Sequence, residues 1–171
     1  MKIKSLLSAA AIIALSGGAA LAQSGGPVKI GVLNDQTSLY ADIGGKGSVE
    51  AAKMAAEDAG QVLGAPVQVI FADHQNKPDV GASIARQWYD QDGVDVITDV
   101  PTSSVALAVN EVSREKKKLV LFTGPASSDL TGPKCSPYSA HWVYNTYSLA
   151  HVTGSAVVKS GGDTWFFLTA D

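Results

Sequence analysis

Hydroxyl and amide side chains follow four short apolar segments of the sequence. Such groups recognise polar or anionic small molecules through hydrogen bonds. Ser103 is the strongest candidate, because it stands where an apolar segment gives way to a helical pattern. A helix N-terminus offers free N–H groups and a positive dipole end, which suit a carboxylate or another small anion. Ser127 follows the next apolar segment in the same way. The four polar groups are residues 34–38, 73–76, 98–104 and 123–128.

A simpler role is open for both serines. Ser, Thr, Asp and Asn are the usual N-cap residues of helices. Thr102 or Ser103 would then only cap the helix that follows, and Ser127 has the same alternative.

Sequence motifs for nucleotide chemistry, hydrolysis or metal binding are absent. Gly44 to Ser48 resembles a phosphate-binding loop, but Gly47 separates the Lys from the Ser, and Tyr40 stands where the motif has Gly. No Gly-x-Gly-x-x-Gly follows the first apolar segment, and no Gly-x-Ser-x-Gly occurs. The three histidines lack the spacing of metal ligands. We therefore expect a binding protein with no catalytic residue, no metal and no cofactor.

Catalysis has two remaining candidates among the titratable residues. Asp35, Asp73 and Asp99 follow apolar segments and could supply an acid–base pair, but Asp is equally frequent in turns. The only cysteine, Cys135, lies in a loop-like stretch with no activating His nearby. Neither feature favours an enzyme.

Apolar segments alternate with helical patterns along the chain. This alternation is typical of βαβ units, and it predicts an α/β fold with a parallel sheet and helices on both faces, as in Rossmann-like three-layer sandwiches. Ligands of open parallel sheets bind beyond the carboxyl ends of the strands. The predicted strands are 28–33, 67–71, 94–97, 119–122 and 165–168, with a short extended piece at 141–144; the predicted helices are 46–59, one capped by Asp79, 105–112 and 148–159.

The N-terminus has the pattern of a cleaved signal peptide. Lys2 and Lys4 precede an apolar run from Leu6 to Leu15, and Ala20 and Ala22 supply the small residues of a cleavage site. The run is shorter than the roughly 20 residues that span a bilayer, although a retained membrane anchor is the alternative. We expect residues 1–22 to be removed and the protein to be exported to the periplasm.

The charge balance argues against nucleic acid as a partner. The chain has 13 Lys and Arg against 16 Asp and Glu, and no basic stripe interleaved with aromatic residues. The chain also stops directly after a predicted strand, and we expect it to be a fragment of a longer protein.

Several segments together resemble the leucine/isoleucine/valine-binding group of periplasmic proteins, the type I substrate-binding proteins of ABC importers. The similarity covers residues 27–171 and depends on the order and spacing of these segments. They are the strand 28–33 with Gly44 and an Ala-rich helix after it, Gly93–Ile97 followed by Thr102–Ser104, and Leu119–Thr123 followed by Pro125–Ser127.

The resemblance implies a two-lobed clamp that buries a solute in its cleft and then meets a membrane permease. Residues 23–171 match the N-terminal lobe, and the second lobe lies outside the sequence. The implied solute is a small carboxylate, either a branched-chain amino acid or an aromatic or other organic acid. The resemblance also implies ligand-binding roles. Ser103 and Ser127 match hydroxyls that bind the ligand carboxylate, Pro101 and Pro125 match backbone positions that line the pocket, and Ile43 matches a residue that leans over the ligand side chain.

Two departures distinguish this chain within that group. Asn76 and Thr102 stand where some members have a disulfide, so this crosslink is absent. The stretch from His141 to Tyr147 is more aromatic than in the amino-acid binders and is closer to relatives that take aromatic acids, which makes Tyr147 a candidate ligand residue. Two alternative functions stay open, a sensory binding domain of the same fold and a secreted α/β enzyme.

Overall fold

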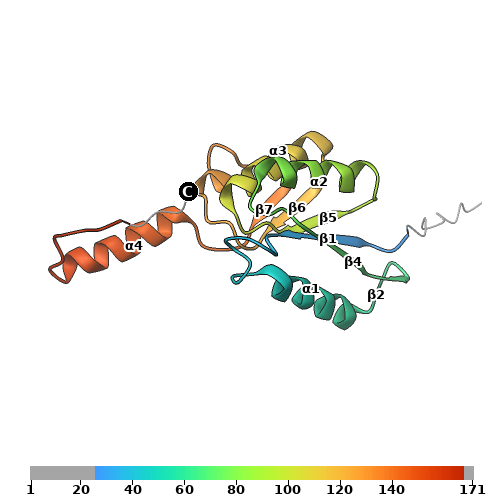
Figure 1. Cartoon of the computed structure of the whole chain (residues 1–171), viewed down its shortest axis with the longest axis horizontal. Helices are drawn as coiled ribbons and strands as arrows, with labels where there is room; N and C mark the ends of the chain where they lie inside the picture. Colours follow the sequence, from blue (N-terminus) through green and yellow to red (C-terminus); the bar gives the residue numbers. More distant parts are fainter. Residues whose placement is uncertain (1–25, 168–171) are drawn as a thin grey trace, which may run out of the picture.

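Five parallel strands form the central sheet, in the spatial order β4-β1-β5-β6-β7 (Figure 1). The computed structural model describes residues 26–167. The chain moves outward from β1 to β4 and then crosses back to β5, so the strand order reverses between β1 and β5. Such a reversal opens a crevice at the carboxyl edge of the sheet. The strands are β1 Lys29–Asn34, β4 Gln68–Asp73, β5 Val96–Asp99, β6 Leu119–Phe122 and β7 Ser139–His141.

Helices cover both faces of the sheet, which confirms the α/β prediction. Helix α1 (Gly45–Ala59) packs on β1 and β4 from one side, and α2 (Pro78–Asp90) and α3 (Ser103–Lys116) lie side by side on the other (Figure 1). A small hairpin of β2 (Gln61–Val62) and β3 (Ala65–Pro66), which the sequence did not predict, links α1 to β4.

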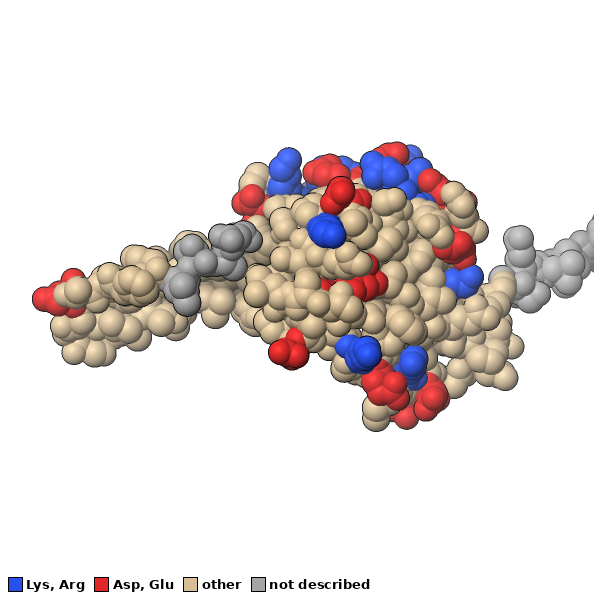
Figure 2. Space-filling view, viewed as in Figure 1, with Lys and Arg blue, Asp and Glu red and all other residues tan. Residues whose placement is uncertain are grey.

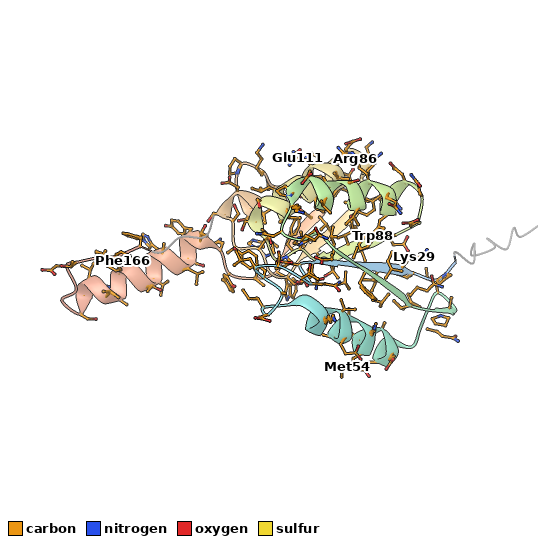
Figure 3. The ribbon with its side chains drawn as sticks, in the orientation of Figure 1. Lys29, Met54, Arg86, Trp88, Glu111 and Phe166 are labelled. Carbon is orange, nitrogen blue, oxygen red and sulfur yellow. The ribbon has the colours of Figure 1, made fainter. Side chains whose placement is uncertain are left out.

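The hydrophobic core lies between the sheet and the α2–α3 layer. Trp88 of α2 points toward the sheet (Figure 3) and is 5% exposed. Burying a large apolar side chain of this kind contributes about 1.5–3 kcal/mol, so this layer is a main source of stability for the sheet and its helices. Other members of the core are Leu33, Val94, Ile97, Val105, Val109, Val120 and Phe122.

The opposite face of the sheet is covered only in part. In β6, Val120 and Phe122 enter the core, whereas Leu119 and Leu121 point to the α1 side and are 52% and 41% exposed. Helix α1 reaches β1 and β4 but leaves this part of the sheet bare.

Charged side chains lie on the outside of the helices. In Figure 2, acidic and basic groups interleave over the α2–α3 rim, where Arg86 and Glu111 are labelled in Figure 3. Two ion pairs join these helices, Arg86 to Glu115 at 3.1 Å and Lys116 to Asp90 at 2.7 Å. The alternating signs leave no basic patch on the face shown.

The last helix, α4 (Thr146–Lys159), projects away from the sheet (Figure 1) and buries none of its residues. It follows a 3-10 turn, η1 (Ser128–Thr131), and β7. No helix within residues 26–167 is long and apolar enough to cross a membrane.

The strand predicted at 165–168 is wrong for the residues that the structure describes. Residues 163–167 carry no regular structure, and Phe166 lies beside α4 (Figure 3) with 91% of its surface exposed. A strand forms only beside another strand, and none is adjacent here. Residue 168 and the predicted signal peptide lie outside the described residues.

Two smaller predictions also need correction. Helix α2 begins at Pro78 with Lys77 as its N-cap, so Asp79 lies in the first turn and does not cap. Proline is favoured at this position because the first helical N–H needs no partner. The last strand of the sheet is Ser139–His141, which shares only His141 with the extended piece expected at 141–144.

Candidate functional site

A cavity of about 390 Å³ opens at the carboxyl edge of the sheet, where the strand order reverses. Its walls come from three strand-end loops, after β1, β5 and β6, and from the segment before α4. The lining residues are Tyr40, Ile43, Pro101, Thr102, Ser103, Ser104, Gly124, Ala126 and Tyr144. None of these side chains carries a charge at neutral pH, and hydroxyl groups dominate one end.

The hydroxyl end coincides with the start of α3. Ser103 is the first residue of the helix and is half-buried, and Thr102 is its N-cap residue. The Thr102 side chain does not cap the helix, and its Oγ1 is buried without a hydrogen-bond partner. The first turn of a helix leaves N–H groups free and carries the positive end of the dipole. An anion placed here would meet hydroxyls and N–H groups together.

Two loops approach each other closely below this end. A Cβ atom on Gly124 would lie 2.7 Å from the Cα of Pro101, so only glycine fits between the β5 and β6 loops. Pro101 lines the cavity as expected, and Ile43 lines it from the β1 loop with 74% of its surface exposed.

The other sequence candidates lie next to the cavity, not in its lining. The Ser127 hydroxyl accepts a hydrogen bond from the Asp129 backbone N–H at 3.3 Å and caps η1. The Pro125 carbonyl accepts a hydrogen bond from His141 Nε2 at 2.6 Å.

Tyr147 lies in the first turn of α4. Its ring stacks on His151 with 5.0 Å between the ring centroids, and 66% of its surface is exposed.

The β1 loop carries Tyr40 and Ile43 and is fixed by the carboxylate of Asp35. This buried carboxylate accepts hydrogen bonds from the Ser38 hydroxyl at 2.6 Å and from the Tyr40 N–H at 2.8 Å. Burial alone would raise the pKa of Asp35, but the hydrogen bonds from Ser38 and the loop N–H groups outweigh it and lower the pKa.

Asp73 fastens the same loop from β4. Its carboxylate accepts hydrogen bonds from the Gln36 N–H at 3.0 Å and the Thr37 hydroxyl at 2.5 Å. Burial opposes ionisation of Asp73 as well, yet these hydrogen bonds lower its pKa. Both carboxylates are therefore ionised and occupied as loop anchors.

Residues 27–171 match the family model of the periplasmic binding proteins. The chain belongs to the periplasmic binding protein family. No curated protein is significantly similar to it.

Two solved structures of this family have substantial sequence identity to the chain. A periplasmic binding protein from Burkholderia mallei is 51% identical, with a TM-score of 0.81, over 85% of this chain and 39% of that protein. A branched-chain amino acid ABC transporter periplasmic ligand-binding protein from Burkholderia xenovorans is 45% identical, with a TM-score of 0.73, over 78% of this chain and 36% of that protein. The chain thus spans well under half the length of these relatives. The resemblance stated from the sequence is confirmed.

More distant solved structures share the fold. A solute-binding protein from Rhodopseudomonas palustris, solved with 4-hydroxybenzoate, is 21% identical with a TM-score of 0.69, over 79% of this chain and 36% of that protein. This family consists of solute-binding proteins, not enzymes. In the described part of the chain, no group of three His, Cys, Asp or Glu side chains is placed to hold a metal ion.

Sequence reasoning missed two tyrosines that line the cavity of this periplasmic binding protein. Tyr40 is an aromatic residue in an otherwise small and polar loop, and this contrast was an available signal. Tyr144 lies in the aromatic stretch that the sequence analysis singled out, but there the candidate was Tyr147. Hydrophobic periodicity cannot tell which side chains of a loop face the cavity, because a loop lacks the regular alternation of side-chain directions found in helices and strands.

Proposed function

We propose that residues 23–171 form the first lobe of the periplasmic solute-binding component of an ABC importer. A small carboxylate-bearing solute binds in the cavity, a second lobe closes over it, and the closed form docks on a membrane permease. Family membership and the Burkholderia relatives support the transport role.

One observation supports the carboxylate most directly. The cavity has no charged side chain in its lining, yet its polar end combines the N-terminus of α3 with the hydroxyls of Thr102, Ser103 and Ser104. Ser103 is half-buried and Ser104 is exposed, so both hydroxyls are accessible from the cavity. A carboxylate would accept hydrogen bonds from these groups.

The rest of the lining favours a solute with a flat ring. Tyr40 and Tyr144 line the cavity together with Ile43 and the small residue Ala126. Aromatic rings pair well with other rings in offset or edge-to-face arrangements. We therefore favour an aromatic acid over a branched-chain amino acid, the solute class named for the Burkholderia xenovorans relative.

The remaining candidates have supporting roles in this proposal. Pro101 and Ile43 contact the solute from two walls. Ser127 and Pro125 flank Ala126 and contribute a hydroxyl and backbone at the rim, and Tyr147 contributes an aromatic side chain beside it.

Titration of the natural full-length protein tests the proposal. Calorimetry would compare benzoate and 4-hydroxybenzoate with leucine, isoleucine and valine, and each acid with its amide. Charge-assisted hydrogen bonds contribute about 1.5–3 kcal/mol, so the amides should bind roughly 10- to 150-fold more weakly. Equal affinity for acid and amide would contradict the carboxylate site, and tighter binding of leucine than of benzoate would contradict the aromatic preference.

Export is tested separately. Expressed in a diderm bacterium, the protein should appear in the periplasmic fraction with Gln23 as its first residue, because cleavage after Ala22 is expected. Mass spectrometry of a membrane-bound species that retains Met1 would contradict this part of the proposal.

A further inference from the structure

A buried hydrogen-bond network lies beneath the cavity at the carboxyl edge of the sheet. Asn34, the last residue of β1, donates from Nδ2 to the Gly45 carbonyl at 2.6 Å and to Asp99 Oδ2 at 3.1 Å. The other oxygen of Asp99 accepts a hydrogen bond from the Thr123 hydroxyl at 3.3 Å. Asn34 is fully buried and Asp99 is 7% exposed.

These contacts join the three strand-end loops that line the cavity. Gly45 ends the loop that carries Tyr40 and Ile43, Asp99 precedes Pro101, and Thr123 precedes Gly124. A backbone hydrogen bond from the Thr123 N–H to the Asp99 carbonyl at 3.2 Å reinforces the same junction. One pair of side chains, Asn34 and Asp99, therefore contacts all three walls.

The backbone at this junction is strained. Asp99 and Val100 have φ angles of 80° and 53°, and positive φ is a genuine outlier for a β-branched residue such as Val. Such conformations persist only where surrounding contacts hold them, and they cluster at functional sites. Here the Val100 N–H donates to the Leu33 carbonyl at 2.9 Å, and the Asp99 carboxylate is held on both sides. This turn directs the chain from β5 into Pro101 and the start of α3.

We infer that Asn34 and Asp99 are positioning residues that set the spacing of the three cavity walls and thereby the affinity of the site. Neither residue lines the cavity, so they act through Gly45, Pro101 and Thr123. The affinity part of this inference rests on the proposed function, whereas the positioning part concerns the protein alone.

The chain offers a closely matched control in Asn110 of α3. Asn110 is also fully buried, its Nδ2 donates to a loop carbonyl, that of Lys134, at 2.7 Å, and its Oδ1 has no partner, as in Asn34. Lys134 does not line the cavity. Both variants thus remove a buried amide that donates to a loop carbonyl, beneath the cavity for Asn34→Ala and away from it for Asn110→Ala, and Asn34→Ala also removes the hydrogen bond to Asp99.

The test uses the natural full-length protein and its two Asn variants. We expect both variants to lower the melting temperature, Asn34→Ala by more, because it also leaves the Asp99 carboxylate with one partner fewer. Only Asn34→Ala should weaken benzoate binding, by about tenfold, the equivalent of one lost hydrogen bond. In hydrogen exchange, only Asn34→Ala should speed exchange of the Tyr40, Val100 and Thr123 amides, which are hydrogen-bonded in the native fold.

Thr123→Val provides a second variant in case Asn34→Ala fails to fold. Thr123 is exposed, and Val has the same β-branched shape. The variant keeps the hydrogen bond from the backbone N–H of residue 123 to the Asp99 carbonyl and removes only the hydrogen bond from the hydroxyl to the Asp99 carboxylate. We expect faster exchange of the Val100 amide and of the amide at position 123, both hydrogen-bonded at this junction. Binding should be about twofold to fivefold weaker, because the removed hydrogen bond is long.

The outcomes separate the two levels of the inference. Equal changes in exchange for Asn34→Ala and Asn110→Ala, or no change in Thr123→Val, would overturn the positioning role. A wild type that binds no acid would refute the proposed function, and the exchange data would still decide the positioning. Acid binding by wild type that Asn34→Ala leaves unchanged would refute the link to affinity.

Discussion

The sheet body and helix α4 differ in what stabilises them. In the body, α2 and α3 bury a continuous apolar layer against the sheet, whereas α4 buries none of its residues and exposes Leu149 and Val152. Short helices gain most of their stability from packing and little from propensity. The body is therefore held together by its own core, whereas α4 lacks such packing; under the proposed function, the body supplies one side of the cleft.

The largest effect is expected when residues 23–171 are compared with the natural full-length protein. A lobe with half a cleft leaves one side of the solute in water, which weakens every polar contact. Residues 23–171 alone should therefore bind the solute at least ~100-fold more weakly than the natural full-length protein, about 2.7 kcal/mol. Calorimetry on the two proteins checks this. Equal affinities would mean that the body suffices for binding.

Loss of the Ser103 hydroxyl should have the next largest effect. If Ser103 donates to a carboxylate beside the N-terminus of α3, Ser103→Ala in the full-length protein should weaken acid binding roughly 10- to 150-fold. Ser155→Ala in α4 is the control and should change affinity less than about twofold. A purely structural role for the Ser103 hydroxyl would give the reverse pattern, lowered folding stability with unchanged affinity. Melting curves beside the titrations distinguish these outcomes.

Much of the body could be predicted from the sequence, because its strands are apolar runs bounded by turn residues. The strand-end position of Ser103 and Pro101 followed from that pattern. The hairpin β2–β3 could not be foreseen, since two-residue strands are too short to show any alternation. Phe166 and its neighbours failed as a strand for another reason. Their composition favours a strand, but strand formation depends on a pairing partner, which composition does not report.

The strand-end residues of the site could be predicted from the sequence pattern, but its loop residues could not. Loop residues such as Tyr40 are placed by side-chain anchors, here the Asp35 carboxylate, and not by a repeating pattern. The network of Asn34, Asp99 and Thr123 joins residues 65 and 24 positions apart, so no local feature indicates it.

A histidine inside the body should make its stability depend on pH. His74 is fully buried, accepts a hydrogen bond from the Asn76 N–H through Nδ1, and has no partner for Nε2. Burial lowers the pKa of His74 despite the opposing attraction of nearby carboxylates such as Asp35. The unfolded chain therefore binds the proton more readily, and stability present above about pH 6.5 falls as the pH drops below that value.

The variant His74→Asn isolates this effect. Asn keeps an acceptor for the Asn76 N–H and cannot titrate, so the loss of stability between pH 7 and 5 should be smaller by at most about 1.4 kcal/mol per pH unit. The lowered pKa values of Asp35 and Asp73 act in a separate window, since their contribution is lost only below about pH 4. Denaturant unfolding at several pH values is the measurement. Parallel curves for wild type and variant would contradict the role of His74.

The smallest effect is expected at the start of α4. Asn145 accepts a hydrogen bond from the Ser148 N–H at 2.8 Å, and the Ser148 hydroxyl faces the Asn145 N–H, which together form a capping box. Asn145→Ala should destabilise α4 by about 1 kcal/mol. Because α4 buries no residue against the sheet, this loss should leave the stability of the hydrophobic core unchanged. In residues 23–171, hydrogen exchange should accelerate across α4 while the amides of α3 and the melting temperature of the body stay unchanged. A lowered melting temperature would instead mean that α4 and the sheet unfold as one unit, and the contrast between the two regions would fail.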